Sequence, residues 1–129
     1  MYLCLSNNII HTMVIDFSNI ELSVMPHFKG GEGDTKSRIF FDGMNKIMLG
    51  CLEPGCTIGY HCHDTSSEMI YILGGQARCL YDDGEELLSP GQCHYCPKGH
   101  SHSLINASTT DLFCHRSRTI AHWLNLYNK

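Results

Sequence analysis

The stretch GCTIGYHCHDTSSEMIYILGG, residues 55–75, has the pattern of two strands joined by a turn. Residues 57–63 and 68–73 are rich in the β-branched, aromatic and other apolar side chains that strands favour. Residues 64–67 between them, Asp-Thr-Ser-Ser, are turn formers. The stretch therefore predicts a tight antiparallel hairpin.

Three polar side chains lie next to this turn. His61 and His63 are two residues apart, so on a strand both imidazoles project to one face, about 7 Å apart along the chain, while Cys62 points to the other face. A tight hairpin brings the carboxylate of Glu68, at the start of the second strand, back beside the two histidines. Two imidazoles and a carboxylate on one wall are three ligands for a borderline divalent metal.

Short strand-like runs continue on both sides of this stretch, with turn signals every several residues from about Gly43 to Asp111. Many short strands at this spacing predict an all-β sandwich or barrel in a single domain. Asp83-Gly84, between two such runs, is a hairpin signal. The segment 26–35 has the composition of a loop, and residues 15–25 fit a strand or a short helical turn. The further predicted strands are residues 38–41, 46–52, 76–81, 85–88, 92–96 and 101–106.

A second run, GQCHYCPKGHSHSLIN at residues 91–106, supplies one more histidine. Pro97-Lys98-Gly99 makes a turn, and His102 lies on the strand that follows it. If the barrel closes so that this strand faces the first hairpin, His102 adds a third imidazole to the same site. Burying four ligand-type side chains together without a partner would be costly, which favours a bound metal.

Together the two runs resemble the paired signature of the cupin superfamily, G-x5-H-x-H-x4-E-x6-G followed by G-x5-P-x-G-x2-H-x3-N. The resemblance implies a jelly-roll β-barrel of six to eight strands, with one divalent metal ion in its interior near the open end. It also implies that His61, His63, Glu68 and His102 hold this ion. The residues that match the signature are Gly55, His61, His63, Glu68 and Gly75 in the first motif and Gly91, Pro97, Gly99, His102 and Asn106 in the second.

Neighbouring side chains are candidates for a substrate pocket beside the metal. By strand parity Ile70 and Ile72 share the face of the carboxylate, and Leu104 shares the face of the last histidine. The alternative, that these three side chains are plain barrel core, fits the pattern equally well. His100 lies in the turn before the last ligand, where we expect it to be exposed and placed to contact a substrate at the barrel mouth.

The composition excludes several classes of function. The net charge of −4 over 129 residues provides no basic surface, so neither nucleic acid nor an anionic membrane is an expected partner. No apolar run approaches the roughly 20 residues that span a bilayer. The sequence is uncharged up to Asp16 and lacks the basic start of a secretory signal, which predicts a cytoplasmic protein.

The eight cysteines are then expected to be thiols, with a disulfide framework as the alternative. Cys93 and Cys96 form a C-x2-C pair, but positions three apart on a strand face opposite sides, and no second pair lies at zinc-finger spacing. We interpret both as small apolar residues of the barrel wall.

The two ends of the sequence depart from a compact barrel, which we predict over residues 13–113. Residues 1–12 are uncharged and unpatterned, so we interpret them as a non-native or disordered extension and Met13 as a possible start. After Phe113 the polar cluster CHRSR is poorly suited to an interior strand, and residues 114–129 are interpreted as an atypical tail, a possible frameshift product. As written, the tail has helical spacing and predicts a short amphipathic C-terminal helix, with a strand-like extension or disorder as alternatives. The apolar residues at this spacing are Ile120, Trp123, Leu124 and Tyr127.

The predicted function is a metal-dependent enzyme that acts on a small molecule, with iron, manganese, nickel or zinc as the ion. Three imidazoles and a carboxylate leave two positions of a six-coordinate ion open, and open positions distinguish catalytic from structural sites. Cupin relatives include dioxygenases, isomerases and lyases, and the resemblance does not choose between them. The alternative is a non-catalytic module that binds or senses a small ligand, because no general acid or base can be placed near the site. The resemblance also implies a homodimer, since pairing of sheet edges hides exposed strands.

Overall fold

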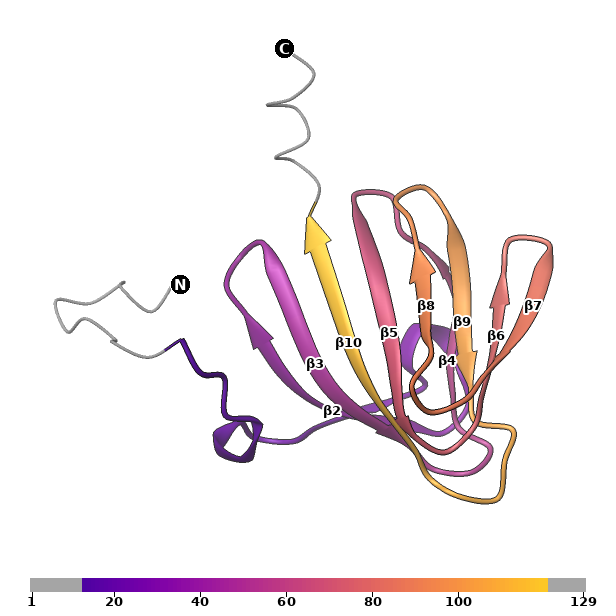
Figure 1. Ribbon diagram of the computed structural model, residues 1–129, viewed down its shortest axis with the longest axis horizontal. Coiled ribbons are helices and arrows are strands. Elements are labelled where there is room, and N and C mark those ends of the chain that lie inside the picture. The colour runs from indigo at the N-terminus through magenta and orange to yellow at the C-terminus, as the bar shows by residue number, and fades with distance from the viewer. Residues whose placement is uncertain (1–12, 121–129) are drawn as a thin grey trace, which may run out of the picture.

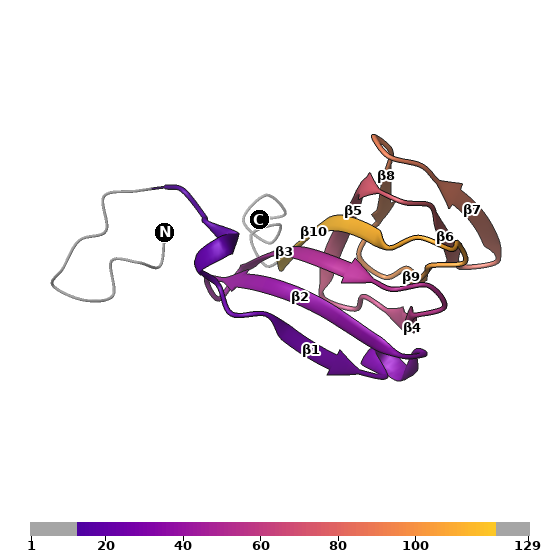
Figure 2. The ribbon, with the colours of Figure 1, turned by 90° about the horizontal axis from the view of Figure 1, so that it is seen from below.

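The computed structural model describes residues 13–120, which form two antiparallel β-sheets packed face to face (Figure 1). In this part of the chain the larger sheet has six strands in the order β1-β2-β3-β10-β5-β8, and the smaller has four in the order β4-β9-β6-β7. β1 and β2 lie at the end of the molecule away from β7 (Figure 2). The architecture confirms the predicted all-β jelly-roll barrel. The strands are β1 (Ser23–Pro26), β2 (Asp34–Phe41), β3 (Asn45–Leu52), β4 (Thr57–Cys62), β5 (Ser66–Gly74), β6 (Ala77–Tyr81), β7 (Gly84–Leu88), β8 (Cys93–Cys96), β9 (Ser101–Ile105) and β10 (Leu112–Ile120).

The segment before β3 is more ordered than the sequence pattern predicts. Residues 15–25 contain both predicted alternatives, because the 3-10 turn η2 (Phe17–Asn19) precedes β1. The predicted loop at residues 26–35 contains a second 3-10 turn, η3 (Phe28–Gly30), and β2 begins at Asp34, before the predicted strand 38–41. Neither turn has the length or apolar character of a membrane-spanning helix, and no other helix occurs in residues 13–120.

The predicted hairpin between β6 and β7 is present, with its turn one position earlier than the Asp-Gly signal. The two strands pair up to Tyr81↔Gly84, so Asp82 and Asp83 form the two-residue loop. Asp82 has a φ of 45°, a left-handed conformation that Asp tolerates and that tight hairpin turns require.

The structure corrects the interpretation of the residues after Phe113 as a tail outside the barrel. They form most of β10, which lies between β3 and β5 in the larger sheet. Leu112, Cys114 and Arg116 alternate as buried positions, whereas Phe113 is exposed. An interior strand can carry this polar cluster because Arg116 has a buried partner, Glu68 on β5. The barrel therefore extends beyond residue 113.

Residues 1–12 and 121–129 lie outside the described residues. The predicted N-terminal extension and the greater part of the predicted C-terminal helix fall in these segments, and Ile120 ends β10. The frameshift hypothesis concerns the DNA sequence and stays a prediction.

The hydrophobic core lies between the two sheets, and it corrects the predicted substrate pocket. Ile70, Ile72 and Leu104 have exposed fractions of 2%, 0% and 1% and belong to this core, which was the alternative that their parity allowed. Full burial of each such side chain contributes roughly 1.5–3 kcal/mol to the free energy of unfolding. The other buried core residues are Leu52, Ile58, Ala77, Cys79, Leu88, Leu112 and Cys114.

Asn106, the last residue of the second motif, ties the end of β9 to two other segments. Its side-chain amide donates to the carbonyl oxygens of Leu52 and Thr110, both at 2.8 Å. Its Oδ1 accepts the backbone N–H of Ser108 at 3.0 Å. The residue is fully buried, so these bonds satisfy polar groups that water cannot reach.

Candidate metal centre

The candidate metal centre is built from both sheets. His61 lies on β4 and His63 follows that strand directly, while β9 carries His102 and β5 of the opposite sheet carries Glu68. His61 and His102 are cross-strand partners in the β4–β9 ladder. The ligand-type atoms of the four side chains lie within 4.8 Å of one another. The structure thus brings together all four residues that the sequence predicts as ligands.

A bulge in β4 directs the first histidine into the site. The register of the β4–β9 ladder shifts between Ile58 and His61. These residues are three apart and would face opposite sides of a regular strand, yet Ile58 packs in the core while His61 reaches the centre. Gly59 lies in the shifted segment, and its carbonyl oxygen accepts the Nδ1–H of His61 at 2.7 Å. Cys62 is exposed, on the face away from the site.

Three imidazole nitrogens and one carboxylate oxygen converge at short range. The Nε2 of His63 lies 3.1 Å from the Nε2 of His61 and 2.9 Å from the Nε2 of His102. The Oε1 of Glu68 lies 3.0 Å from the Nε2 of His102 and 3.5 Å from the Nε2 of His63. His63, Glu68 and His102 have exposed fractions of 6%, 4% and 1%, so these atoms are largely removed from solvent.

The groups behind the imidazoles leave the Nε2 lone pairs facing one another. His61 donates through Nδ1 to Gly59, and the Nδ1 of His63 lies 3.4 Å from the Oγ of Ser66, which can accept its proton. The Oε1 of Glu68 has no hydrogen-bond donor, because the nearby imidazole nitrogens then present lone pairs to it. Buried acceptors without donors are costly unless a cation lies between them. The donor set therefore fits a divalent ion that accepts imidazole and carboxylate ligands.

Protonation states at neutral pH suit the same role. Burial lowers the pKa of His61 from its ordinary 6.5 to about 4, an effect that the hydrogen bond to Gly59 opposes and the neighbouring imidazoles reinforce. Burial alone would raise the pKa of Glu68, but it is outweighed by the hydrogen bonds that His102 and His63 can donate when no metal occupies their Nε2 atoms and by the charge of Arg116, so that pKa is lowered. His61 is therefore neutral and Glu68 anionic, which are the forms that bind a metal.

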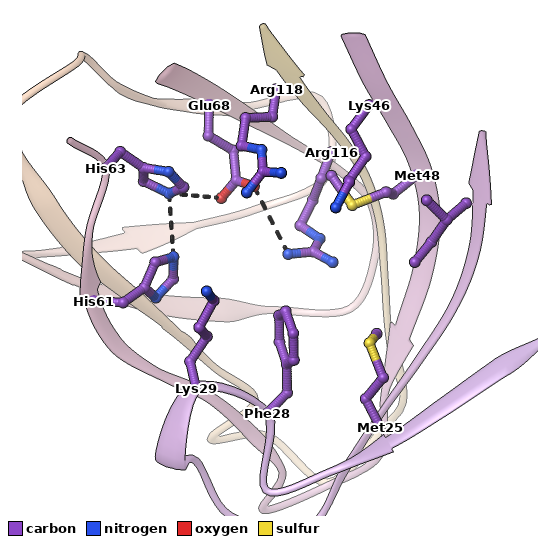
Figure 3. Close-up of a pocket in the computed structure, with 11 residues that line it drawn as sticks. Met25, Phe28, Lys29, Lys46, Met48, His61, His63, Glu68, Arg116 and Arg118 are labelled. Atoms are coloured by element: carbon purple, nitrogen blue, oxygen red, sulfur yellow. Dashed lines mark hydrogen bonds and ion pairs between the residues drawn. The ribbon is translucent and has the colours of Figure 1, made fainter. Parts of the chain in front are cut away.

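A cavity of about 80 Å³ opens beside the ligands, and its lining is rich in positive charge. Figure 3 shows His61, His63 and Glu68 converging on one side of this space, with cationic side chains directed into it from the other elements. Its cationic residues are Lys29, Lys46, Arg116 and Arg118, and its apolar residues are Met25, Phe28, Ile39 and Met48.

Arg116 differs from the other three cations because it has a buried partner. One of its guanidinium nitrogens lies 3.8 Å from the Oε2 of Glu68, and the guanidinium lies over the Phe28 ring, 5.9 Å from its centroid. Among residues 13–120, no carboxylate lies within 4.0 Å of Lys29, Lys46 or Arg118. The cavity therefore presents positive charge that the carboxylates of residues 13–120 do not compensate, even before a metal is added.

η3 reaches the cavity because its backbone lies directly against β4. A Cβ at Gly59 would stand 2.0 Å from the carbonyl oxygen of Lys29, and a Cβ at Gly31 would stand 2.2 Å from that of Thr57. Only glycine permits an approach this close. The contact holds Phe28 and Lys29 at the cavity, where Figure 3 shows Lys29 directed toward the ligands.

Some functional candidates differ from the prediction. His100 is half-exposed, as expected, but it pairs with Asp82, with Nδ1 and Oδ2 2.7 Å apart, and it does not line the cavity. Sequence reasoning missed Lys29 and Lys46 and placed Arg116 and Arg118 in a tail. Leu112, Cys114, Arg116 and Arg118 follow one another at intervals of two residues. This alternation is the signal that would have placed both arginines on one face of a strand.

Known proteins are similar to this chain in sequence and in structure. The family model of the cupin domain matches residues 48–115. A protein of Thermotoga maritima named oxalate-binding protein is 31% identical over an alignment of 107 positions, which covers 78% of this chain and 88% of that protein. A crystal structure of a predicted oxalate decarboxylase from the same organism has a TM-score of 0.78 at 24% identity and covers 84% of this chain and 99% of its own. The cupin domain of Cnp3 from Schizosaccharomyces pombe has a TM-score of 0.72 at 10% identity, covering 90% and 80% of the two chains.

Acidification should destabilise the metal-free protein and release any bound metal. His61 takes up its proton near pH 4 in the folded protein and near pH 6.5 in the unfolded chain. Between these values the unfolded chain binds more protons, so the free energy of unfolding should fall as the pH decreases from about 6.5 to about 4. Glu68, whose pKa is also lowered by folding, should extend the loss to lower pH.

Urea denaturation of chelator-treated protein at several pH values measures this slope, and elemental analysis follows metal occupancy. In His61→Ala the slope between pH 6.5 and pH 4 should be shallower. Metal occupancy that stays constant from pH 8 to pH 5 would contradict the four-ligand assignment, because ligation requires neutral imidazoles.

Proposed function

The chain belongs to the cupin family, and on that premise we propose that it binds one divalent metal ion and, beside it, a small dicarboxylate anion. The ion is held by His61, His63, Glu68 and His102. The observation that carries the proposal is that three of these residues, His61, His63 and Glu68, line a cavity together with four cationic side chains. A bound metal would add further positive charge, so the cavity favours a compact ligand with more than one negative charge.

We propose iron, manganese, nickel or zinc as the metal, because the donors are imidazoles and a carboxylate. When bound, such an ion supplies Lewis-acid attraction for a carboxylate oxygen, and iron or manganese can also supply redox chemistry. Four protein ligands leave open positions on a six-coordinate ion, as a site that binds a small molecule requires.

The cationic residues would hold the part of the anion that points away from the ligands. Arg118 is the cross-strand partner of Glu68 in the β10–β5 ladder, and Lys46 and Lys29 reach the same cavity from β3 and η3. The name of the relative that is 31% identical over 107 residues makes oxalate the first anion to test. A cavity of about 80 Å³ suits it, because that space holds only a few water molecules or an anion of similar size.

Calorimetric titration of metal-loaded protein with oxalate tests the proposal. Oxalate should bind the metal-loaded protein, and His61→Ala should lose both metal and oxalate. Arg118→Gln should weaken oxalate binding roughly 10-fold or more, because a lost charge-assisted hydrogen bond costs about 1.5–3 kcal/mol. Arg78→Gln is the matched control, since Arg78 pairs with Glu85 on the exposed surface. Equal oxalate affinity with and without metal, or an unaltered affinity in Arg118→Gln, would contradict the proposal.

A lyase is the second candidate function, and it is favoured by the presence of Lys46 in the cavity wall. Loss of CO2 from oxalate breaks the C–C bond and leaves an electron pair on the remaining carboxylate carbon, which must take up a proton to give formate. Burial lowers the pKa of Lys46, and the nearby Arg118, Arg116 and Lys29 lower it further. Its ammonium group, in the cavity wall, therefore releases a proton more readily than that of an ordinary lysine. A dioxygenase or an isomerase stays a prediction from the sequence.

Lys46→Arg separates binding from turnover, because arginine keeps the charge but does not release a proton near neutral pH. If Lys46 is the proton donor, oxalate affinity should be retained while formate production falls by about 100-fold or more. Unaltered turnover in Lys46→Arg would exclude this role. Oxalate binding without formate production by the unaltered protein would favour the non-catalytic module.

We also propose a homodimer that covers the outer face of the larger sheet. Large apolar side chains are exposed on neighbouring strands of this face, and Met69 is directly paired with Tyr95. Contiguous exposed apolar surface marks an interface, and self-association is the simplest way to cover it. The residues concerned are Met69, Tyr71 and Leu73 on β5, Tyr95 on β8 and Phe113 on β10.

Sedimentation equilibrium should therefore give twice the mass of the chain. Tyr71→Lys should shift the protein toward the monomer, because a charge would be buried in the interface. Leu87→Lys is the control, since Leu87 is 74% exposed on β7 of the other sheet and lies outside the proposed contact. A monomer mass for the unaltered protein at micromolar concentration would contradict the proposed dimer.

The cytoplasm is the compartment that we propose for this protein. The seven cysteines in the described residues are free thiols, and Cys93 and Cys96 face opposite sides of β8. Reducing conditions keep such thiols intact.

A further inference from the structure

A buried histidine outside the ligand set contacts one of the ligands from behind. His94 lies on β8 with an exposed fraction of 4%, and it does not line the cavity. Its Nε2 lies 3.1 Å from the Nδ1 of His102, and the two rings stack with centroids 5.2 Å apart. Its Nδ1 lies 2.5 Å from the Oε1 of Glu86 on β7. Glu86, His94 and His102 therefore form a continuous chain that ends at the metal ligands.

The proton positions along this chain follow from the carboxylate. Glu86 can only accept, so the proton between it and His94 is on the Nδ1 of His94. The neutral His94 ring then has a lone pair on Nε2, which accepts the Nδ1–H of His102. With its proton on Nδ1, His102 presents a lone pair on Nε2, the atom that lies 2.9 Å from the Nε2 of His63 and 3.0 Å from Glu68. The opposite tautomer would direct an N–H into the ligand set and block it.

We infer that Glu86 and His94 are positioning residues that fix the tautomer and orientation of His102, so that its Nε2 faces the metal. This inference rests on the proposed metal binding. His61 obtains the same constraint locally from the carbonyl of Gly59, and the hydroxyl of Ser66 is placed to accept the Nδ1–H of His63. For His102 the constraint comes from β8 and β7, which are edge strands of different sheets. Outer partners of this kind typically change metal affinity by about 10–100-fold.

The same atoms raise one alternative, a second metal site. The ligand-type atoms of Cys79, His94 and His102 also lie within 4.8 Å of one another. Burial raises the pKa of the Cys79 thiol to about 12, which disfavours the thiolate that a metal needs, and its Sγ lies 3.7 Å from the carbonyl oxygen of Leu80. Because Glu86 holds the proton of His94 on Nδ1, the Nε2 of His94 can accept the Nδ1–H of His102. A hydrogen-bonded chain accounts for these contacts without a second ion.

Zinc affinity, measured by competition with a chromogenic chelator, tests the inference in matched variants. His94→Phe removes the acceptor and should weaken zinc binding about 10–100-fold. His94→Gln should restore much of the affinity, because an amide oxygen can accept the Nδ1–H of His102. Glu86→Gln should weaken zinc binding as well, because an amide can donate to His94 and reverse the proton order. Asp82→Asn is the control, since Asp82 makes the same carboxylate–imidazole contact with His100 at the surface.

Histidine 15N–1H correlation spectra of the zinc-loaded protein supply a readout that a purely structural role would not change. His102 should be protonated at Nδ1 and metal-bound at Nε2 in the unaltered protein and in Asp82→Asn. Ligation of His102 through Nδ1 would overturn the inference, as would full zinc affinity in both His94→Phe and Glu86→Gln. A second equivalent of zinc that is lost in Cys79→Ser would also overturn it, by making His94 a ligand.

The failure of the inference can be told apart from the failure of the proposed function. If the unaltered protein binds no divalent metal, the proposed function is refuted and the inference with it. If zinc binding is lost in His61→Ala but unaffected by changes at His94 and Glu86, only the inference is refuted. Glu86→Gln conserves volume at a side chain that is 37% exposed, so it remains informative if His94→Phe does not fold.

Discussion

Glu68 is an ionised carboxylate held with an exposed fraction of 4% in the barrel interior, and its pairing with Arg116 constrains the elements around it. A buried charge is strongly unfavourable without an opposite charge and hydrogen-bonding groups nearby. β10 supplies the guanidinium from the neighbouring strand of the same sheet, while β4 and β9 supply imidazoles from the opposite sheet. Residues of both sheets therefore surround the Glu68 carboxylate, with Arg116 as its opposite charge.

The cavity beside the candidate ligands contains further charges that need opposite charges. Arg116 compensates Glu68, whereas Lys29, Lys46 and Arg118 line the cavity without a carboxylate partner among the described residues. Positive charge that the protein leaves uncompensated has to be balanced by solvent ions or by a ligand. A small anion beside a divalent metal would satisfy both the imidazole–carboxylate donors and the cations.

Orientation of the imidazoles is controlled from outside the site. Each ligand histidine has a different group at its Nδ1: a carbonyl of the bulged β4, a hydroxyl at the start of β5, and the ring of His94. The first two groups lie within three residues of the histidine that they contact, so they are set by local backbone geometry. The third depends on the approach of β7 to β8, so one ligand is sensitive to how the two sheets meet.

The sequence was sufficient to predict the features that depend on residues close together in the chain. The alternation of strands predicts that His61 and His63 share a face opposite Cys62, and turn residues predict most strand limits and the β6–β7 hairpin. The four candidate ligands were also predicted from the sequence, through the match of two motifs to a known signature, and the structure brings them together. The predicted strand limits were wrong where a segment has little hydrophobic pattern, as in the residues just before β3.

Only the tertiary structure decided the features that depend on partners distant in sequence. The residues after Phe113 form an interior strand because Glu68, far away in the chain, compensates Arg116. Ile70, Ile72 and Leu104 became core and not pocket, since strand parity assigns a face but not the depth of each residue along the barrel. The cationic cavity and the Glu86–His94–His102 chain likewise join separate strands. A sequence determines the side of a strand on which a residue projects, but the residue opposite it, and hence the charge it must balance, is set by how the sheets close.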